Sequence, residues 1–276
     1  MRPIFLAEPI ARKHHPAEPS SRDEVFYLAT TDNTACSPEF SITISRLAAS
    51  LTEAASLINR RYSWRGYGGA HKLSNGANAT TFVARRNDQL FGTLTLCADS
   101  DHGLNVDETF PDDMAFFRHK RNSTLCELTK FAVDYERDTL KVLASLFHFI
   151  FLYGTENAVG TDLLIEINPR HVAFYEKMLG FQRVGGLKTN RAVDAPSQLM
   201  WLSVSEIPEW IESGRHKENR RSLYNYFYEP GQQAAIIREL RRRGLTANAG
   251  KVLPGAGSAD YALAGLDSPP MFHEAV

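Results

Sequence analysis

The sequence predicts an α/β (α+β) fold, with a mixed central β-sheet flanked by helices and a helical C-terminal appendage. Residues 124–133 and 162–167 are strand-like apolar runs on either side of a helix-like segment at 140–153. Two strands joined by a crossover helix should be parallel and covered on both faces, which fits their nearly continuous apolar character. Residues 80–85 and 90–98 flank the sequence Asn-Asp-Gln and predict an antiparallel hairpin. The appendage is predicted from helix-like segments after the last strand.

The composition is typical of a soluble globular protein. The 276 residues are 43% hydrophobic and 23% charged, and the formal net charge of -1 gives no general reason to expect nucleic acid or an anionic membrane as a partner. Cys36, Cys97 and Cys126 lack metal-ligand spacing, so we expect buried structural thiols, no metal site and a reduced compartment. No apolar run has the length of a transmembrane segment or the form of a signal peptide, and we expect a cytoplasmic protein.

The N-terminal part of the chain contains an arm, a strand and a helix. Residues 1–38 have no sustained period and predict an N-terminal arm. Residues 40–47 alternate between apolar and polar and predict the first strand. Ser50 and Glu53 form a capping-box pattern for a helix of about four turns. The segment 60–69 is rich in arginine, aromatic residues and glycine, and should end that helix.

The middle of the chain contains a long connection and then a second helix. Residues 99–122 are charged and irregular, which predicts a lid or substrate loop. The Asn168-Pro169 pair predicts a helix start, because Asn caps free backbone N–H groups and Pro is tolerated at the first helical position. Residues 181–186 and 197–204 are predicted to be the last two strands, joined by a polar loop.

The sequence divides into a main domain at 39–204, a helical basic appendage at 205–245 and a flexible tail at 246–276. Between positions 214 and 245 there are eight Lys or Arg residues against three acidic residues. Such an excess is either a solvated face or a surface that attracts an acidic partner.

Glu127 is the candidate catalytic carboxylate. It lies in a mostly apolar strand, and alternation places Leu125, Glu127, Thr129, Phe131 and Val133 on one face and Cys126, Leu128, Lys130 and Ala132 on the other. A carboxylate in such a position must be paired, lie in a cleft or be partly neutralised, and desolvation raises its pKa toward the range of a general base. The alternative is a structural glutamate held by a basic side chain.

Asn168 and Tyr175 are seven residues apart and lie near the same face of the predicted second helix. Asn168 is either a helix cap or a ligand contact. Tyr175 either donates a proton to a leaving group or packs in the core. The segment containing Arg61, Trp64, Arg65 and Tyr67 has side chains suited to binding, although its aromatic residues are equally explained by packing.

Two motifs resemble known acyltransferases. Residues 168–181, NPRHVAFYEKMLGF, look like the last motif of the GCN5-related N-acyltransferase (GNAT) superfamily, and residues 126–134, CELTKFAVD, resemble a strand of acyl-homoserine-lactone autoinducer synthases. Together they are similar to the N-acyl amino acid synthase (FeeM-like) branch, whose members take long acyl chains from acyl carrier protein. The resemblance covers about residues 40–204 and implies a GNAT-like fold and acyltransferase activity.

The chain departs from the coenzyme-A-dependent members of that superfamily after the first parallel strand. Those members have a glycine-rich phosphate loop there, whereas residues 134–142, DYERDTLKV, contain no glycine. The resemblance therefore implies an acyl-phosphopantetheine donor on acyl carrier protein in preference to acyl-coenzyme A, and no permanently bound cofactor. The basic appendage is expected to steer the acidic carrier protein.

The resemblance also implies roles for the candidate residues. Glu127 removes a proton from an amino acid or related small amine, and Tyr175 protonates the departing thiolate. The thioester arm pairs with the free backbone edge at Phe131, Ala132 and Val133. The remaining binding residues are Arg61 and Arg65 for the acceptor carboxylate, Trp64, Tyr67 and Phe131 for apolar groups, and Thr129 and Asn168 beside the substrate.

Two other functions fit the same sequence. One is a coenzyme-A-dependent acetyltransferase acting on a small amine or a protein. The other is a catalytically silent acyltransferase fold that binds a partner such as nucleic acid through its basic C-terminal segment.

Overall fold

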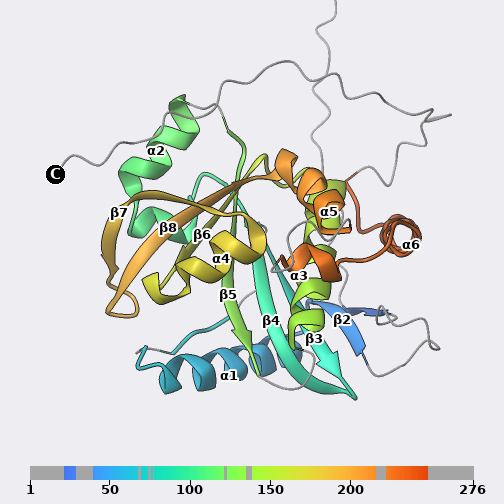
Figure 1. Ribbon diagram of the computed structural model, residues 1–276. Coiled ribbons are helices and arrows are strands. Elements are labelled where there is room, and N and C mark those ends of the chain that lie inside the picture. The colour runs from blue at the N-terminus through green and yellow to red at the C-terminus, as the bar shows by residue number, and fades with distance from the viewer. Residues whose placement is uncertain are drawn as a thin grey trace, which may run out of the picture.

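The computed structural model describes residues 22–28, 40–67, 70–73, 76, 78–120, 123–134, 139–215 and 222–247. These residues form one eight-stranded sheet in the order β1-β2-β3-β4-β5-β6-β8-β7, flanked by helices (Figure 1). The strands are β1 (Glu24–Tyr27), β2 (Phe40–Ser45), β3 (Ala79–Arg86), β4 (Gln89–Ala98), β5 (Leu125–Val133), β6 (Asp162–Ile167), β7 (Gln182–Asn190) and β8 (Ala195–Ser203). The α-helices are α1 (Ala48–Trp64), α2 (Pro111–Lys120), α3 (Thr139–Glu156), α4 (Val172–Leu179), α5 (Ile207–Arg215) and α6 (Pro230–Arg242). Four short 3-10 helices are η1 (Asn105–Glu108), η2 (Pro169–His171), η3 (Val204–Glu206) and η4 (Leu223–Tyr226).

The predicted mixed sheet is confirmed. The β5–β6 pair is parallel and the other six neighbouring pairs are antiparallel. The predicted hairpin is β3–β4, and its two turn residues, Asn87 and Asp88, have positive φ angles of 49° and 62°, as tight hairpin turns require. The loop between β7 and β8 is shorter than predicted, because both strands extend toward it and leave only residues 191–194.

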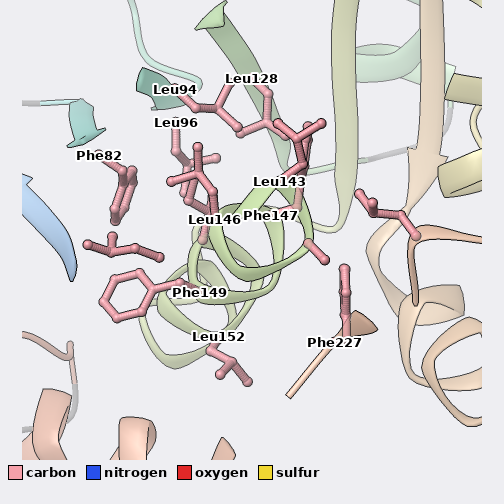
Figure 2. Packing of buried hydrophobic residues seen from close by; sticks show 14 of the residues in the cluster. Phe82, Leu94, Leu96, Leu128, Leu143, Leu146, Phe147, Phe149, Leu152 and Phe227 are labelled. Carbon is pink, nitrogen blue, oxygen red and sulfur yellow. The ribbon is translucent and has the colours of Figure 1, made fainter. Parts of the chain in front are cut away.

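α3 fills the core on one face of the sheet. Its side chains Leu146 and Phe149 pack with Phe82 of β3 in the main apolar cluster (Figure 2). Its outer side is covered by the C-terminal elements, where Phe227 stacks on the buried ring of His148 with centroids 4.4 Å apart. A helix that is apolar all round must be covered on all sides. The predicted appendage therefore completes the core around α3.

The opposite face is covered by α1, η1 and α2. The prediction that residues 99–122 are irregular is wrong, because this segment contains η1 and α2. Phe110 and Met114 are fully buried against this face of the sheet. Arg118 of α2 holds the segment by bonds of 2.6–2.8 Å to both Asp99 and Asp107. Such pairing between distant positions has no local sequence pattern.

The predicted N-terminal arm is wrong at residues 24–27, which form edge strand β1. Phe26 is buried there, with its ring 4.9 Å from that of Phe149 in α3. A strand of four residues is too short to show a period. The rest of the predicted arm, residues 1–21 and 29–38, and nearly all of the predicted tail lie outside the described residues.

The predicted cap at the start of α1 is also corrected. Asp23, rather than Ser50, accepts the backbone N–H of Leu47 at 2.8 Å, and the Ser50 hydroxyl itself donates to Asp23. The predicted capping box with Glu53 is therefore absent from the described structure of this helix. The predicted end of α1 is confirmed, because the helix stops at Trp64, inside the arginine-rich stretch 60–69. The chain leaves the helix at Gly66, whose φ is 80°.

Candidate active site

An opening between β5 and β6 is the central feature of the site. The two strands pair only at three positions, Leu125–Asp162, Cys126–Leu163 and Glu127–Leu164. Beyond Glu127, β5 continues to Val133 paired with β4, and β6 continues to Ile167 paired with β8. Within the described chain, each strand therefore has one edge without a strand partner. A backbone edge of this kind offers N–H and C=O groups to a ligand.

A β-bulge in β5 changes which side chains face each side of this opening. Thr93 of β4 pairs with Ala132, whereas Thr95 pairs with Thr129, so Lys130 and Phe131 together occupy the space opposite a single residue. Lys130 has a φ of 55°. An extra residue reverses the alternation beyond it.

The bulge overturns the strict alternation predicted for β5. Phe131 and Val133 join Leu128 in the cluster around α3, and the ring of Phe131 lies 5.7 Å from that of Phe147. Ala132 instead packs against α1 on the other face. The expected grouping of Phe131 and Val133 with Glu127 is therefore wrong, and the sequence carries no glycine that would have marked the bulge.

Glu127 lies on the α2 side of the sheet, with 2% of its surface exposed. One oxygen, Oε2, accepts hydrogen bonds from the backbone N–H of Asn105 at 2.8 Å and from its side-chain amide at 3.1 Å. Burial raises the pKa of Glu127 to about 7, and the nearby charge of Glu166 acts in the same direction, while the Asn105 bonds oppose it. A carboxyl group that exchanges its proton near neutral pH is suited to general base catalysis.

Glu166 is a second carboxylate at the opening, and the sequence reading did not identify it. It follows Leu164, the partner of Glu127, by two residues and so faces the same side of the sheet. Its Oε1 accepts hydrogen bonds from Asn190 at 2.7 Å and Ser197 at 2.6 Å. Alternation along β6 is the signal that was available, but its relation to Glu127 depends on the strand register.

Thr129 and the two described cysteines complete the strand surface near Glu127. Thr129 is paired with Thr95, whose hydroxyl lies 2.9 Å from that of Thr81. Cys97 is the cross-strand neighbour of Glu127. Burial raises the pKa of Cys97 and Cys126 to about 12. Both thiols therefore stay protonated at neutral pH, as expected for structural cysteines, while Cys36 lies outside the described residues.

The predicted binding arginines gather at the C-terminal end of α1. Arg61 and Arg65 flank the Trp64 ring, with guanidinium carbons 5.6 and 4.7 Å from its centroid. Trp64 is 71% exposed and therefore available to a ligand. Arg61 also lies 3.6 Å from Asp134 at the end of β5. Within the described residues, Arg65 has no carboxylate at ion-pair distance, and its charge remains uncompensated.

At the same end of the opening, a hydrogen bond joins the segment after α1 to the segment after β6. The hydroxyl of Tyr67 accepts a hydrogen bond of 2.6 Å from Arg170, which follows β6. Asn168 caps the next helical turn by accepting the Arg170 N–H at 3.2 Å. The cap interpretation of Asn168 is therefore confirmed. We refer to Arg61, Trp64, Arg65, Tyr67 and Arg170 as the cationic rim.

Tyr175 lies in α4, on the α3 side of the sheet. It is buried, with its ring in edge contact with those of Phe174 and Phe181 at 5.3 and 5.8 Å. Glu127 and Tyr175 therefore belong to opposite faces. The strands β5 and β6 are no longer paired beyond Glu127.

An apolar pocket lies on the α3 side and was not predicted. It runs from β5 and β6 to the C-terminal elements, between α3 and α4. Figure 2 shows four of its lining residues, Leu96, Leu128, Phe147 and Phe227. The lining also includes Cys126, Ile150, Phe151, Gly154, Thr155, Val159, Gly160, Leu163, Leu179, Phe181, Leu202, Val204, Ile207 and Tyr224. Its residues come from nine different helices and strands and the loops between them, so no single stretch of sequence indicates it.

The expected cationic face on α6 is largely neutralised. Arg241 pairs with Glu156 at 2.7 Å, Arg242 pairs with Glu239 at 2.6 Å, and Arg243 pairs with both Glu239 and Glu24. The basic residues at 217, 220 and 221 lie outside the described chain. Among the described residues, no group of His, Cys, Asp and Glu is arranged to hold a metal ion, and no helix is long and apolar enough to cross a membrane.

Comparison with known proteins gives a consistent family. Residues 53–203, more than half of the chain, match the family of the N-acyl amino acid synthase FeeM. The solved structure of FeeM, an N-acyl amino acid synthase from uncultured soil microbes, is 28% identical with a TM-score of 0.54, and the match covers 63% of this chain and 93% of that one.

Two other solved structures have lower sequence identity. A coenzyme-A-dependent acyl-homoserine lactone synthase, BjaI, is 9% identical with a TM-score of 0.45, covering 59% of this chain and 79% of that one. An aminoglycoside 6'-acetyltransferase of type Ii is 18% identical with a TM-score of 0.42, covering 59% and 96%. The comparison with curated protein sequences gives no match. With more than half of its length matched to one family, the chain belongs to the FeeM family of N-acyl amino acid synthases and is an N-acyltransferase.

Proposed function

We propose that the protein transfers a long-chain fatty acyl group from acyl carrier protein to the amine of an amino acid or related small amine. The observation that carries the proposal is the two-sided opening between β5 and β6. A buried carboxylate with a pKa of about 7 lies on one side, and an apolar pocket lies on the other. A polar acceptor and an apolar acyl chain would then meet at the opening from opposite faces.

The proposed chemistry uses both faces. The thioester lies along the free edge of β5, where a backbone N–H of the Phe131–Val133 segment stabilises the tetrahedral oxyanion, an interaction worth about 3 kcal/mol in well-studied enzymes. Glu127 takes a proton from the acceptor ammonium group, and the free amine attacks the thioester carbon. The C–S bond then breaks and Tyr175 supplies a proton to the thiolate. The nitrogen loses its second proton as the amide forms, which restores the tyrosine, so that one proton in all remains on Glu127.

The donor proposal is supported by the chain that follows β5. Asp134 follows the strand and lies 2.6 Å from Arg60, and residues 134–142 contain no glycine. A coenzyme A pyrophosphate usually requires bare backbone N–H groups at this position. A phosphopantetheine arm presented by a protein needs fewer such contacts. The cationic rim supplies positive charge for its phosphate or for the acceptor carboxylate.

The test is a product assay with the purified protein. Acyl carrier protein carrying chains of different length, or acetyl-coenzyme A, is incubated with a mixture of amino acids, and mass spectrometry identifies the acylated product. We expect long-chain N-acyl amino acids from the carrier protein. In Glu127→Gln, the rate should fall by about 10²- to 10⁴-fold. Faster turnover of acetyl-coenzyme A would favour the acetyltransferase alternative, and full activity of the folded variant would remove Glu127 from the mechanism.

The pocket provides a second test of the acyl-chain position. Leu163 lines the pocket, so Leu163→Trp should fill it and shift the preference toward shorter acyl chains. Leu140 lies in the first turn of α3 but is 42% exposed, and Leu140→Trp is the matched control. An unchanged chain-length preference in Leu163→Trp would place the acyl chain elsewhere.

A further inference from the structure

Glu166 has features that its structural contacts alone do not explain. Both of its neutral donors, Asn190 and Ser197, bond to the same oxygen, Oε1. Within the described part of the chain, Oε2 receives no hydrogen bond and no Lys or Arg is paired with this carboxylate. A half-buried carboxylate in this state has unused capacity for a cationic donor.

The position of Glu166 relative to Glu127 is fixed by the strands. Leu164 pairs with Glu127 at the last position before β5 and β6 separate. Glu166 is two residues further along β6, about 7 Å beyond that pair. It therefore lies at the opening itself, on the face where Glu127 is buried, and the hydrogen bonds to β7 and β8 hold its side chain there.

We propose that Glu166 binds the ammonium group of the acceptor and positions it for deprotonation by Glu127. This inference rests on the proposed function and specifies how its substrate is recognised. The cationic rim would take the acceptor carboxylate, so an amino acid would bind with its two charges between opposite charges of the protein. After binding, one proton passes from the ammonium group to Glu127, and the resulting neutral amine is released toward the thioester.

The kinetic test is Glu166→Gln, because glutamine keeps an oxygen for Asn190 and Ser197 while removing the charge. We expect the KM for the amino acid to rise about 10- to 100-fold, since hydrogen bonds to charged groups are strong, while the KM for the acyl donor stays unchanged. Asn190→Ala removes a structural bond but keeps the carboxylate charge. Glu176→Gln removes a surface charge of the same sign outside the site. Equal changes in the KM values of both substrates, or the same effect in Asn190→Ala, would assign Glu166 a structural role only.

A second measurement does not depend on turnover. Glu166 and Glu127 carry like charges, so Glu166→Gln should lower the pKa of Glu127. Carboxyl ¹³C NMR of labelled protein follows this titration directly, and the acid limb of kcat/KM for the amino acid should move to lower pH with it. An unchanged Glu127 titration would show that the two carboxylates are not coupled and would overturn the inference.

The two proposals fail in different ways. If the wild-type protein acylates no amine from any donor, the proposed function is refuted, and the NMR titration alone then decides whether Glu166 acts on Glu127. If transfer occurs but Glu166→Gln leaves the KM for the amino acid unchanged, the proposed function stands and the role of Glu166 is refuted. L-leucine and N-acetyl-L-leucine serve as binding probes, because only the first has an ammonium group. Wild type, but not Glu166→Gln, should prefer L-leucine.

Discussion

Glu127 should reduce the stability of the protein at the pH where its proposed role as a general base requires the charged form. Its pKa is raised from an ordinary value of 4.5 to about 7, chiefly because it is buried. Between these values the folded protein holds a proton that the unfolded chain has lost. Raising the pH from 4.5 to 7 therefore lowers the free energy of unfolding, and the full decrease, about 3 kcal/mol, is present above pH 7.

Glu127→Gln removes this decrease while keeping the shape of the side chain and an oxygen for Asn105. We expect the variant to be inactive but more stable than wild type by about 3 kcal/mol at pH 8, which corresponds to about 6–12 °C in Tm for a domain of this size. The difference should shrink as the pH falls through 7 and disappear below 4.5.

Urea denaturation of both proteins at several pH values measures the effect. The slope of free energy against denaturant should be the same in both, because the surface exposed on unfolding does not change. A stability difference that is constant with pH would mean that Glu127 does not titrate as described. A less stable variant at pH 8 would show that the charged carboxylate is stabilised by its surroundings, and the general-base argument would lose its physical basis.

Three further predictions concern other parts of the fold. Gly180→Ala should lower the free energy of unfolding by about 1–3 kcal/mol in a denaturation assay, because Gly180 has a φ of 77° and an added Cβ would lie 2.9 Å from Trp210. Gly186→Ala, with open space around the added Cβ, should leave the stability unchanged in the same assay. Arg118→Gln should lower both the free energy of unfolding, measured by denaturation, and kcat, measured by product formation, because it frees the segment whose η1 backbone binds Glu127. An unchanged kcat in a destabilised variant would show that the two effects are separate. Arg65→Gln should raise the KM for an amino acid about tenfold but leave unchanged the KM for the corresponding amine, which lacks a carboxylate. Equal effects on the KM of both acceptors would exclude Arg65 from carboxylate binding.

The parallel unit was predictable because its signals are local. The apolar runs of β5 and β6 and the helical pattern between them lie within a short stretch of sequence. Asn168 and Gly180 mark the limits of the next helical segment by the backbone geometry that each residue favours. These features depend on neighbouring residues, and the structure follows them closely.

The features that were missed depend on contacts between distant residues. α1 begins just after Arg46 and Leu47, whose backbone N–H groups donate to Asp23, and α2 is held by the pairs of Arg118. The bulge at Lys130 is visible only from the pairing of β5 with β4. Glu166 becomes a neighbour of Glu127 only through the register of β6. In each case the residue type was visible in the sequence, but the partner that determines its role was not.

The bulge gives the two faces of the opening their different character. With regular alternation, Phe131 and Val133 would lie beside Glu127, and an acyl chain bound to them would occupy the same face as the ionisable carboxylate. The extra residue at Lys130 moves both side chains to the α3 side, where Leu128 begins the apolar pocket. Apolar surface and the titrating carboxylate are thereby separated by the sheet, so that an acyl chain would contact the α3 face while the acceptor amine reaches Glu127 from the other. Contact between the two substrates would then be confined to the gap between β5 and β6, which is where the chemistry of acyl transfer requires them to meet.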